Sequence, residues 1–307
     1  MLAIPAIKPV FINNMAQNKK LLLGISDRSL RTQTLELLEG AGYAINISLA
    51  GHRITLDDPE IECFVSGAHE LADWVQEGIL DICILQKARL LDQGIKVKEI
   101  AEFKYGTGIW DLGKVVVAVP DKSPIKTIKD LQGKEILSRL PNLTENFLKA
   151  NNLTAKIIRV SYPSEPKGEM LGKPVVDFTN TGKTLKEHNM RVLAVIMTTS
   201  PRLIMNNKAY QDKWKREKAE TLAMLLQGAR LAKDMIGLMM HVSHNILPAV
   251  LKILPAMKKP TVTQLRGESV FDVLTVINKQ QSRVLLPQLK ALGCTDIVEF
   301  PLDRVIV

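Results

Sequence analysis

The chain has 307 residues, of which 46% are hydrophobic and 24% charged, and its formal net charge is +9. This composition supports sizeable hydrophobic cores and excludes intrinsic disorder, a collagen-like repeat and a disulfide scaffold. The three cysteines (Cys63, Cys83 and Cys294) are few and far apart, which fits a protein of the reducing cytoplasm.

The excess of 41 basic over 32 acidic residues favours an anionic partner. Aromatic residues make up only 5%, and no stacking motif or basic helix stands out, so phosphorylated small molecules are favoured over nucleic acid. No apolar run approaches the roughly 20 residues of a membrane span, so no membrane partner is predicted. The apolar stretch 2–12 lacks the basic start of a secretory signal, and we expect a short ordered or frayed arm there.

The first part of the chain alternates short apolar strands with amphipathic helices. Strands are predicted at 20–26, 61–66 and 79–85, and helices at 30–41 and 68–78. A second series has strands at 114–120, 134–138, 155–160 and 174–178, and a helix that opens at Pro141. This alternation is typical of βαβ units in a mostly parallel sheet, and we expect two α/β lobes with a cleft between them.

The pattern then changes along the chain. The strand predicted at 191–198 is expected to return to the first lobe, and the clearest helix follows at 214–233. Beyond it the order βαββαβ is that of the ferredoxin-like unit. The predicted domains are therefore lobe I over 1–113 and 191–234, lobe II over 114–190, and a ferredoxin-like domain over 235–307.

The segment 175–185 offers the clearest chemistry, because a strand ends in an acid and a hydroxyl-rich turn leads into a helix. Consecutive backbone N–H groups and a helix N-terminus suit a phosphate, and Gly182 lets the backbone approach it closely. Asp177 suits sugar hydroxyls or Mg²⁺, and it also excludes a P-loop, which needs glycine at that position. A capped helix start with an exposed lysine explains the pattern equally well. The candidate phosphate loop comprises Asp177, Thr179, Asn180, Thr181, Gly182, Lys183 and Thr184.

Three other residues are candidate contacts to anions or nucleotides. Arg28 and Lys87 follow predicted strands, at the ends where open α/β sheets bind ligands, although each taken alone is more simply a solvated side chain. Glu165 lies in a predicted turn at 161–168 and is either a cleft carboxylate or a surface acid. The five histidines show no ligand spacing, so no metal ligand and no catalytic residue is assigned.

Several segments resemble the long form of ATP phosphoribosyltransferase, the first enzyme of histidine biosynthesis. The matching segments are 58–63, 75–81, 130–134, 141–144, 181–182 with 184–185, 214–216, 225–229, 259–262, 289–293 and 297–302. The resemblance implies an α/β, two-lobed core like that of periplasmic binding proteins, with a C-terminal ferredoxin-like (βαββαβ) regulatory domain that binds histidine as a feedback inhibitor. It also implies a cytoplasmic homo-oligomer, either a dimer or a hexamer.

The resemblance further implies a reaction in which N1 of ATP attacks the anomeric carbon of phosphoribosyl diphosphate. Pyrophosphate leaves, Mg²⁺ is the cofactor, and the candidate phosphate loop holds the 5′-phosphate and the ribose. Such a reaction depends on positioning and on charge stabilisation rather than on a protein nucleophile.

The chain departs from the family pattern at several polar and glycine positions. Asp27 and Arg28 stand where Lys-Gly is usual, Cys83 and Gln86 replace glycines, and Arg139 occupies an acidic position. Two functions therefore stay open: an active ATP phosphoribosyltransferase, and a catalytically impaired paralogue that binds a nucleotide or histidine as a regulatory subunit. A two-lobed solute-binding protein is disfavoured by the βαββαβ segment.

Overall fold

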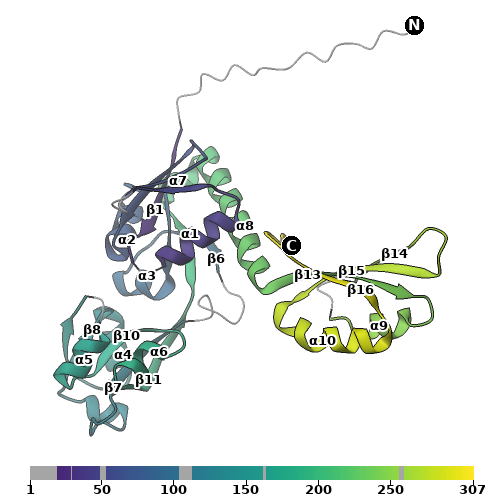
Figure 1. The fold of residues 1–307 in the computed structure, drawn as a ribbon. Coiled ribbons are helices and arrows are strands. Elements are labelled where there is room, and N and C mark those ends of the chain that lie inside the picture. The colour runs from purple at the N-terminus through teal and green to yellow at the C-terminus, as the bar shows by residue number, and fades with distance from the viewer. Residues whose placement is uncertain (1–18, 29, 49–52, 104–112, 162–163, 256–258) are drawn as a thin grey trace.

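The computed structural model describes residues 19–28, 30–48, 53–103, 113–161, 164–255 and 259–307. Their strands form three larger sheets and one two-stranded hairpin, and Figure 1 shows each larger sheet with its own helices. The arm predicted at 2–12 lies outside the described residues. Within the described ranges, no helix combines the length and apolarity that a bilayer crossing needs.

The first sheet, with its helices, is called lobe I below. Its strand order is β4-β1-β5-β12-β6, in which β4, β1 and β5 are parallel and β12 is antiparallel to both neighbours. The strands are β1 (Leu21–Ser26), β4 (Ile61–Ser66), β5 (Ile82–Gln86), β6 (Lys98–Glu102) and β12 (Pro201–Met205). The helices are α1 (Arg31–Gly40), α2 (Ala68–Glu77), α3 (Lys87–Gln93), α7 (Asn207–Gln211) and α8 (Lys213–Asp234).

The core of lobe I joins segments that are far apart in sequence. Leu222 and Leu226 of α8 pack with Leu23 of β1 and Leu37 of α1 in one buried cluster. The apolar stripe predicted for 214–233 therefore faces this core. A hairpin of β2 (Ile45–Ile47) and β3 (Ile54–Leu56), which the sequence pattern did not predict, also contributes to it.

The second sheet, with its helices, is called lobe II below. Its order is β11-β7-β10-β8-β9, in which β10, β8 and β9 are parallel and β7 is antiparallel to β10 and β11. The strands are β7 (Gly113–Pro120), β8 (Glu135–Ser138), β9 (Lys156–Arg159), β10 (Val175–Thr179) and β11 (Met190–Thr199). The helices are η1 (Ile128–Leu131), α4 (Pro141–Ala150), α5 (Glu165–Leu171) and α6 (Lys183–Glu187).

Two sequence predictions for lobe II need correction. The strand predicted at 191–198 is present as β11, but it pairs with β7 in the second sheet, and the chain reaches lobe I only with β12. A long apolar strand fits either sheet, so its pattern did not distinguish them. The turn predicted at 161–168 becomes α5 from Glu165, because Pro166 sits in the first turn, where it opens a helix.

The third sheet is the predicted ferredoxin-like unit and is called the C-terminal unit below. Its elements are β13 (Met235–Ser243), α9 (Leu247–Ile253), β14 (Thr261–Gln264), β15 (Val270–Asn278), α10 (Lys279–Leu292) and β16 (Thr295–Pro301). The sheet order β14-β15-β13-β16 is antiparallel throughout, so the βαββαβ prediction is confirmed. The exact boundaries of the three predicted domains stay a prediction.

The C-terminal tail ties this unit back to lobe I. The guanidinium of Arg304 donates to the carbonyl of Ala41 at 2.9 Å, and the amide of Val305 donates to the carbonyl of Gly228 at 3.0 Å. A Cβ at Gly228 would lie 3.2 Å from Ile306 and 3.3 Å from the carbonyl oxygen of Val305, so the tail packs closely against this glycine. Helix α8 thus links the two units by continuity and by packing, as Figure 1 shows.

Candidate functional site

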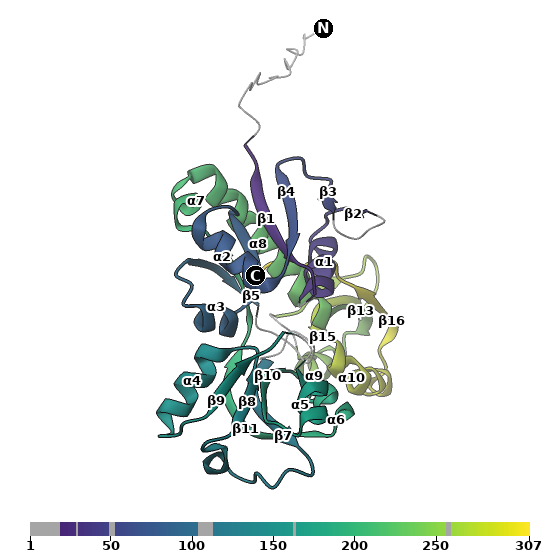
Figure 2. The same cartoon turned by 90° about the vertical axis from the view of Figure 1, so that its left-hand side faces the viewer.

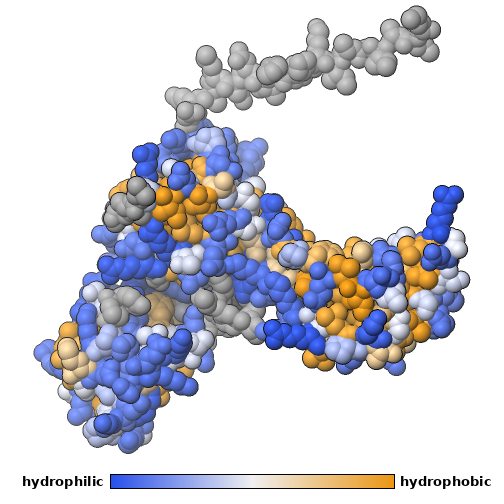
Figure 3. All heavy atoms as spheres, viewed as in Figure 1, coloured by the Kyte–Doolittle hydropathy of each residue, from blue (hydrophilic) through white to orange (hydrophobic). Residues whose placement is uncertain are grey.

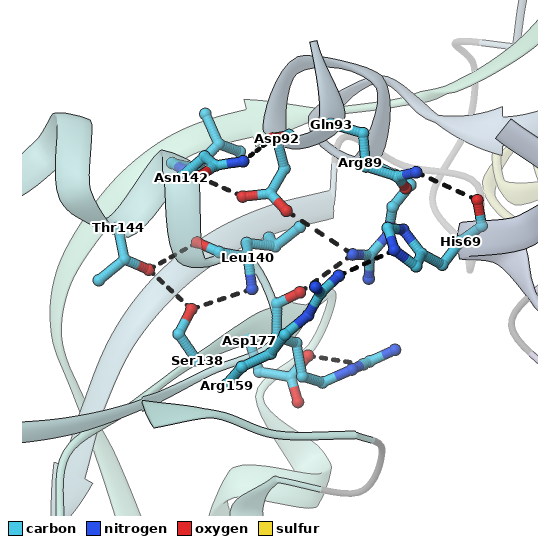
Figure 4. Close-up of polar contacts among 12 residues, drawn as sticks. His69, Arg89, Asp92, Gln93, Ser138, Leu140, Asn142, Thr144, Arg159 and Asp177 are labelled. Carbon is cyan, nitrogen blue, oxygen red and sulfur yellow. Dashed lines mark hydrogen bonds and ion pairs between the residues drawn. The ribbon is translucent and has the colours of Figure 1, made fainter. Parts of the chain in front are cut away.

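The candidate site lies where lobes I and II face each other. Figure 2 shows α3, which follows β5 in lobe I, beside α4, which follows β8 in lobe II. Both helices start at the carboxyl ends of their strands, which is where ligands bind in open α/β sheets. Figure 4 shows the polar side chains that meet at this boundary.

Asp177 is the most buried member of the candidate phosphate loop, with 1% of its surface exposed. Its Oδ1 accepts hydrogen bonds from Arg139 Nη1 and from the amide of Phe178, each at 2.7 Å. Its Oδ2 accepts a hydrogen bond from the hydroxyl of Ser164. The sequence analysis assigned this carboxylate to a sugar or a metal, but both of its oxygens accept hydrogen bonds from the protein itself.

The turn of the candidate phosphate loop is closed by its own hydroxyls. The amide of Gly182 donates to Thr179 Oγ1 at 3.1 Å, and the amide of Lys183 donates to Thr181 Oγ1 at 3.3 Å. Gly182 has φ +75°, a left-handed conformation that favours glycine, and no atom lies within 4 Å of a Cβ built there. A ligand can therefore reach this backbone, although it must replace the hydroxyls as acceptor.

The remaining loop side chains face outward. Asn180, Thr181, Lys183 and Thr184 are exposed. The side chain of Lys183 is 82% exposed, and its ammonium lies 3.8 Å from the carboxylate of Glu187, one turn along α6. The structure thus separates the predicted loop into a buried acid and an exposed turn.

Glu165 is buried, with 4% exposed, so its interpretation as a surface acid is wrong. Its Oε2 accepts a hydrogen bond from the amide of Ser164 at 3.1 Å. Burial, and secondly the nearby carboxylate of Asp177, raise the pKa of Glu165 above its ordinary value. Glu165 and Asp177 therefore form part of one buried polar group together with Ser164 and Arg139.

The two candidates from lobe I stay apart from this group. Arg28 is 69% exposed and lies 3.8 Å from the carboxylate of its neighbour Asp27. Lys87 opens α3, and its ammonium pairs with Glu99. Both follow their strands as predicted, yet each cation has an acidic partner within its own lobe.

Lobe I reaches lobe II through α3 instead. Asp92 Oδ1 accepts a hydrogen bond from the amide of Leu143 at 3.0 Å, and the carbonyl of Asp92 accepts one from Asn142 Nδ2 at 2.6 Å. Because Leu140, the residue at the N-cap of α4, has no side-chain cap of its own, an acid from the other lobe caps this helix. Figure 4 shows Asp92 and Asn142 pointing toward one another.

Three arginines complete the boundary. Arg89 of α3 donates from Nη1 to the carbonyl of Arg139 at 3.0 Å, and its guanidinium lies 5.9 Å from the centre of the Phe178 ring. The guanidinium of Arg139 lies 5.6 Å from the same ring. Arg159, at the end of β9, contacts His69 Nε2 of lobe I at 2.9 Å.

An open polar depression of about 230 Å³ lies beside these contacts. Its lining comes from both lobes and consists of His69, Asp73, Asp92, Gln93, Pro141, Asn142 and Arg159. Its walls carry two carboxylates, one guanidinium and two amide side chains, so they are suited to a polar ligand. The boundary between the lobes is therefore accessible from outside.

The described residues do not fit a protein-held Mg²⁺. No group of three or more histidine, cysteine or acidic side chains among them is arranged to hold a metal ion. Asp177, the acid offered by the sequence, is paired with Arg139. Carboxylate oxygens satisfied by a guanidinium, a hydroxyl and an amide are not available as metal ligands.

The sequence analysis missed Arg89, Asp92 and Ser164 as site residues, and it noted Arg139 only as a departure from the family pattern. Arg139 directly follows β8, so the rule that selected Arg28 and Lys87 also applies to it. Arg89 and Asp92 belong to α3, a helix that the apolar pattern did not predict. No sequence signal indicated that α3 would face α4.

The comparisons with known proteins agree across the chain. Residues 68–228 match the family model described as ATP phosphoribosyltransferase, and residues 232–304 match the model of its C-terminal domain. The ATP phosphoribosyltransferase of Thermodesulfovibrio yellowstonii is 38% identical over 94% of this chain and 99% of its own length. That of Desulforudis audaxviator is also 38% identical, with the same two coverages.

A solved structure supports the fold. A chain of the ATP phosphoribosyl transferase (HisG:HisZ) complex from Thermotoga maritima has a TM-score of 0.55 and 21% sequence identity over 67% of this chain and 98% of that chain. The two family models together extend from lobe I to the end of the C-terminal unit. The chain therefore belongs to the ATP phosphoribosyltransferase family, a transferase family of histidine biosynthesis, in its long form with the additional C-terminal domain.

Proposed function

We propose that this protein transfers the phosphoribosyl group of phosphoribosyl diphosphate to N1 of ATP. The observation that carries this function is the 38% identity, over 94% of the chain, to proteins named ATP phosphoribosyltransferase. The net charge of +9 suits two polyanionic substrates. The exposed turn at Gly182, beside the boundary between the lobes, offers a place for a phosphate.

In this reaction a bond forms between N1 of ATP and the anomeric carbon, and the bond from that carbon to the pyrophosphate oxygen breaks. Pyrophosphate leaves with the electron pair. The protein's task is to align the two substrates and to stabilise the charge that develops on the leaving group. The amides of Gly182 and Lys183 would exchange their bonds to Thr179 and Thr181 for bonds to the 5′-phosphate.

Mg²⁺ belongs to this proposal as part of the substrate. Because the described residues hold no fitting set of ligands, the ion would arrive on the diphosphate. Asp177 would then act on the substrate indirectly, by fixing Arg139 and Ser164.

We also propose that the protein is cytoplasmic, and that its C-terminal unit carries histidine inhibition and homo-oligomer formation. Figure 3 shows apolar residues gathered over this unit. Met239 pairs with Leu274 on one side and with Val298 on the other, so the three form one row across the sheet. Leu274 and Val298 are 39% and 45% exposed, which favours contact with a second copy as a dimer or a hexamer.

One observation favours the alternative of a regulatory subunit without catalysis. The carboxylate of Asp177 is paired with Arg139, and Arg139 stands where relatives are expected to have an acid. Neither side chain is more than 15% exposed. A site that satisfies its own acid in this way has less to offer a ribose. Such a chain would bind a nucleotide or histidine and assemble with an active homologue.

An activity assay on the purified, folded protein separates the two functions. It contains ATP, phosphoribosyl diphosphate and Mg²⁺, with pyrophosphatase to remove the product, and is run with and without histidine. Turnover that histidine inhibits supports the transferase and its regulation. No turnover from folded protein contradicts the transferase, and restored turnover on adding an active homologue then supports the regulatory subunit.

A further inference from the structure

Arg89 carries a buried positive charge at the boundary between the lobes. Only 9% of the residue is exposed, and its close partner is a neutral group, the carbonyl of Arg139 at 3.0 Å. Among the carboxylates that the structure describes, the nearest approach is 3.9 Å, to Asp92, whose Oδ1 also caps α4. A guanidinium so far removed from water is stabilised by a close anion, and among the described residues the carboxylate of Asp92, at 3.9 Å, is the one that pairs with it.

A second guanidinium stands close to it. Arg89 and Arg139 both lie within 6 Å of the centre of the Phe178 ring, and Arg159 lies near enough to repel Arg89. Burial first, and then the charge of Arg139, lower the pKa of Arg89 to about 10. The charges of Arg139 and Arg159, from the ends of β8 and β9, thus both repel Arg89.

The acids near these cations neutralise them only in part, because one has further hydrogen-bond donors and the other has a raised pKa. Asp177 accepts hydrogen bonds from Ser164 and from the amide of Phe178 besides Arg139. Glu165 has a raised pKa, which favours its neutral form. An anionic ligand would therefore relieve more repulsion here than the resident acids do.

We propose that Arg89 of lobe I and Arg139 of lobe II together bind one phosphate group of a diphosphate ligand across the boundary between the lobes. This assignment rests on the proposed function, because the diphosphate is taken to be the leaving group of that reaction. A guanidinium has five N–H donors in a planar fork that matches two phosphate oxygens. Phe178 lies beside both guanidinium groups and holds them in place through its ring face.

The position of the two arginines explains what binding would accomplish. Arg89 belongs to the same helix as Asp92, and Arg139 precedes Leu140, the N-cap residue of the helix that Asp92 caps. A phosphate between the two guanidiniums would reinforce the contact between α3 and α4 rather than break it. The ligand would thereby link lobe I to the strand ends of lobe II, beside the candidate phosphate loop.

The test is calorimetric titration of the full-length protein with inorganic pyrophosphate at low ionic strength. The variants are Arg89→Gln, Arg139→Gln and the double variant, and the control is Arg283→Gln, an exposed position on α10 that carries the same charge change. We expect each single substitution at the site to weaken pyrophosphate binding about tenfold or more, and the control to leave it unchanged. The double variant should lose less than the product of the single losses, because both residues hold one group.

Arg89→Lys guards against a variant that does not fold. It keeps the charge and loses the fork, so weaker binding than in the wild type, with an unchanged melting temperature, supports the two-oxygen contact. Wild-type binding in folded Arg89→Gln, or no pyrophosphate binding by the wild type, overturns the proposal.

Turnover is measured in parallel to separate this proposal from the proposed function. Pyrophosphate binding that depends on both arginines, without any turnover, supports the proposed binding site and contradicts the proposed transferase activity. Turnover with an unchanged KM for phosphoribosyl diphosphate in Arg89→Gln supports the transferase activity and contradicts the proposed binding site.

Discussion

Asp81 of lobe I and Asp177 of lobe II are both buried, and each is held by a cation and a backbone amide of its own lobe. In lobe I, Asp81 accepts from Lys215 Nζ at 2.7 and 2.8 Å and from the amide of Leu22 at 2.9 Å. In lobe II, Asp177 accepts from Arg139 and from the amide of Phe178, each at 2.7 Å. The bonding is almost the same in the two places, and the surroundings differ.

The difference lies at the two ends of the strands. Asp81 directly precedes β5, at its amino end, and its lysine partner comes from α8. Asp177 lies within β10, beside the loop that follows its carboxyl end, where α/β sheets bind ligands. The same ion-pair chemistry therefore joins a helix to a sheet in lobe I, whereas in lobe II it shapes a candidate site. Breaking each pair should separate stability from function.

The largest expected effect on stability comes from Lys215→Met. The substitution leaves the carboxylate of Asp81, whose side chain is 7% exposed, without its cation. Removing one partner of a buried pair costs about 3 kcal/mol of the free energy of unfolding. Chemical unfolding followed by fluorescence measures it. Lys20→Met, which breaks the exposed Lys20–Glu62 pair, is the control and should cost less than about 1 kcal/mol. Equal losses in the two variants would contradict the comparison.

The largest expected effect on function comes from Asp177→Asn. The amide keeps the size of the side chain but loses the charge that orients Arg139, and a misplaced guanidinium costs about 10²-fold in turnover. The assay with ATP and phosphoribosyl diphosphate measures kcat/KM, and a melting curve verifies the fold. The matched variant Asp81→Asn should lower the melting temperature while kcat/KM of the folded protein is retained. If Asp81→Asn instead lowered kcat/KM and Asp177→Asn lowered only the melting temperature, Asp81 would be the acid that supports function and Asp177 the one that supports stability.

Local sequence patterns account for most of the fold and for only part of the site. The strands β1, β4, β7 and β8 and the whole βαββαβ order were predictable, because their apolar runs and turn residues act over a few neighbours. The short helix α3 and the sheet membership of β11 were not, because both depend on tertiary contacts. Asp177, near the end of a strand, and Gly182, in the turn that follows it, were found by their positions relative to that strand, which is a local rule.

The pairing of charged side chains could not be predicted from the sequence. Arg28, Lys87 and Arg139 follow strands in the same way, but only Arg139 is covered by the other lobe and meets a buried acid. Ser164 and Asp177 are 13 positions apart, and Asp92 and Leu143 are 51 apart. Contacts at such separations follow from how the sheets and helices pack, which no local pattern specifies.

A smaller effect is expected from Asp92→Ala, which removes the cap that lobe I places on α4. We expect a loss of about 1 kcal/mol, faster hydrogen exchange at the amide of Leu143, and a higher KM for phosphoribosyl diphosphate because the lobes separate more readily. Asp212→Ala is the matched control, since Asp212 caps α8 within lobe I by accepting from the amide of Lys215. It should lower stability without changing KM. A KM that changes equally in both variants would remove the link between this cap and substrate binding.

The smallest expected effect concerns Glu165 and pH. Its folded-state pKa is raised, chiefly by burial and then by Asp177, so folding favours the protonated form. The stability that this proton provides is complete below the unfolded-state pKa, near 4.5, and is lost as the pH rises through the folded-state pKa. Glu165→Gln carries a neutral group at every pH and avoids that loss. The variant should therefore gain stability relative to the wild type as the pH rises above about 4.5.

Unfolding curves at a series of pH values measure this difference in stability. Glu135→Gln is the comparison variant, because its change in stability should have the opposite sign. Lys156 and Lys173 lower the pKa of Glu135 to about 2, so its contribution is present at neutral pH and is lost on acidification. The two variants should diverge from the wild type in opposite directions at neutral pH. If Glu165→Gln instead loses stability as the pH rises, the Glu165 carboxylate is stabilised in its charged form. The buried group around Asp177 would then accommodate two negative charges, and the repulsion proposed among its arginines would be largely neutralised.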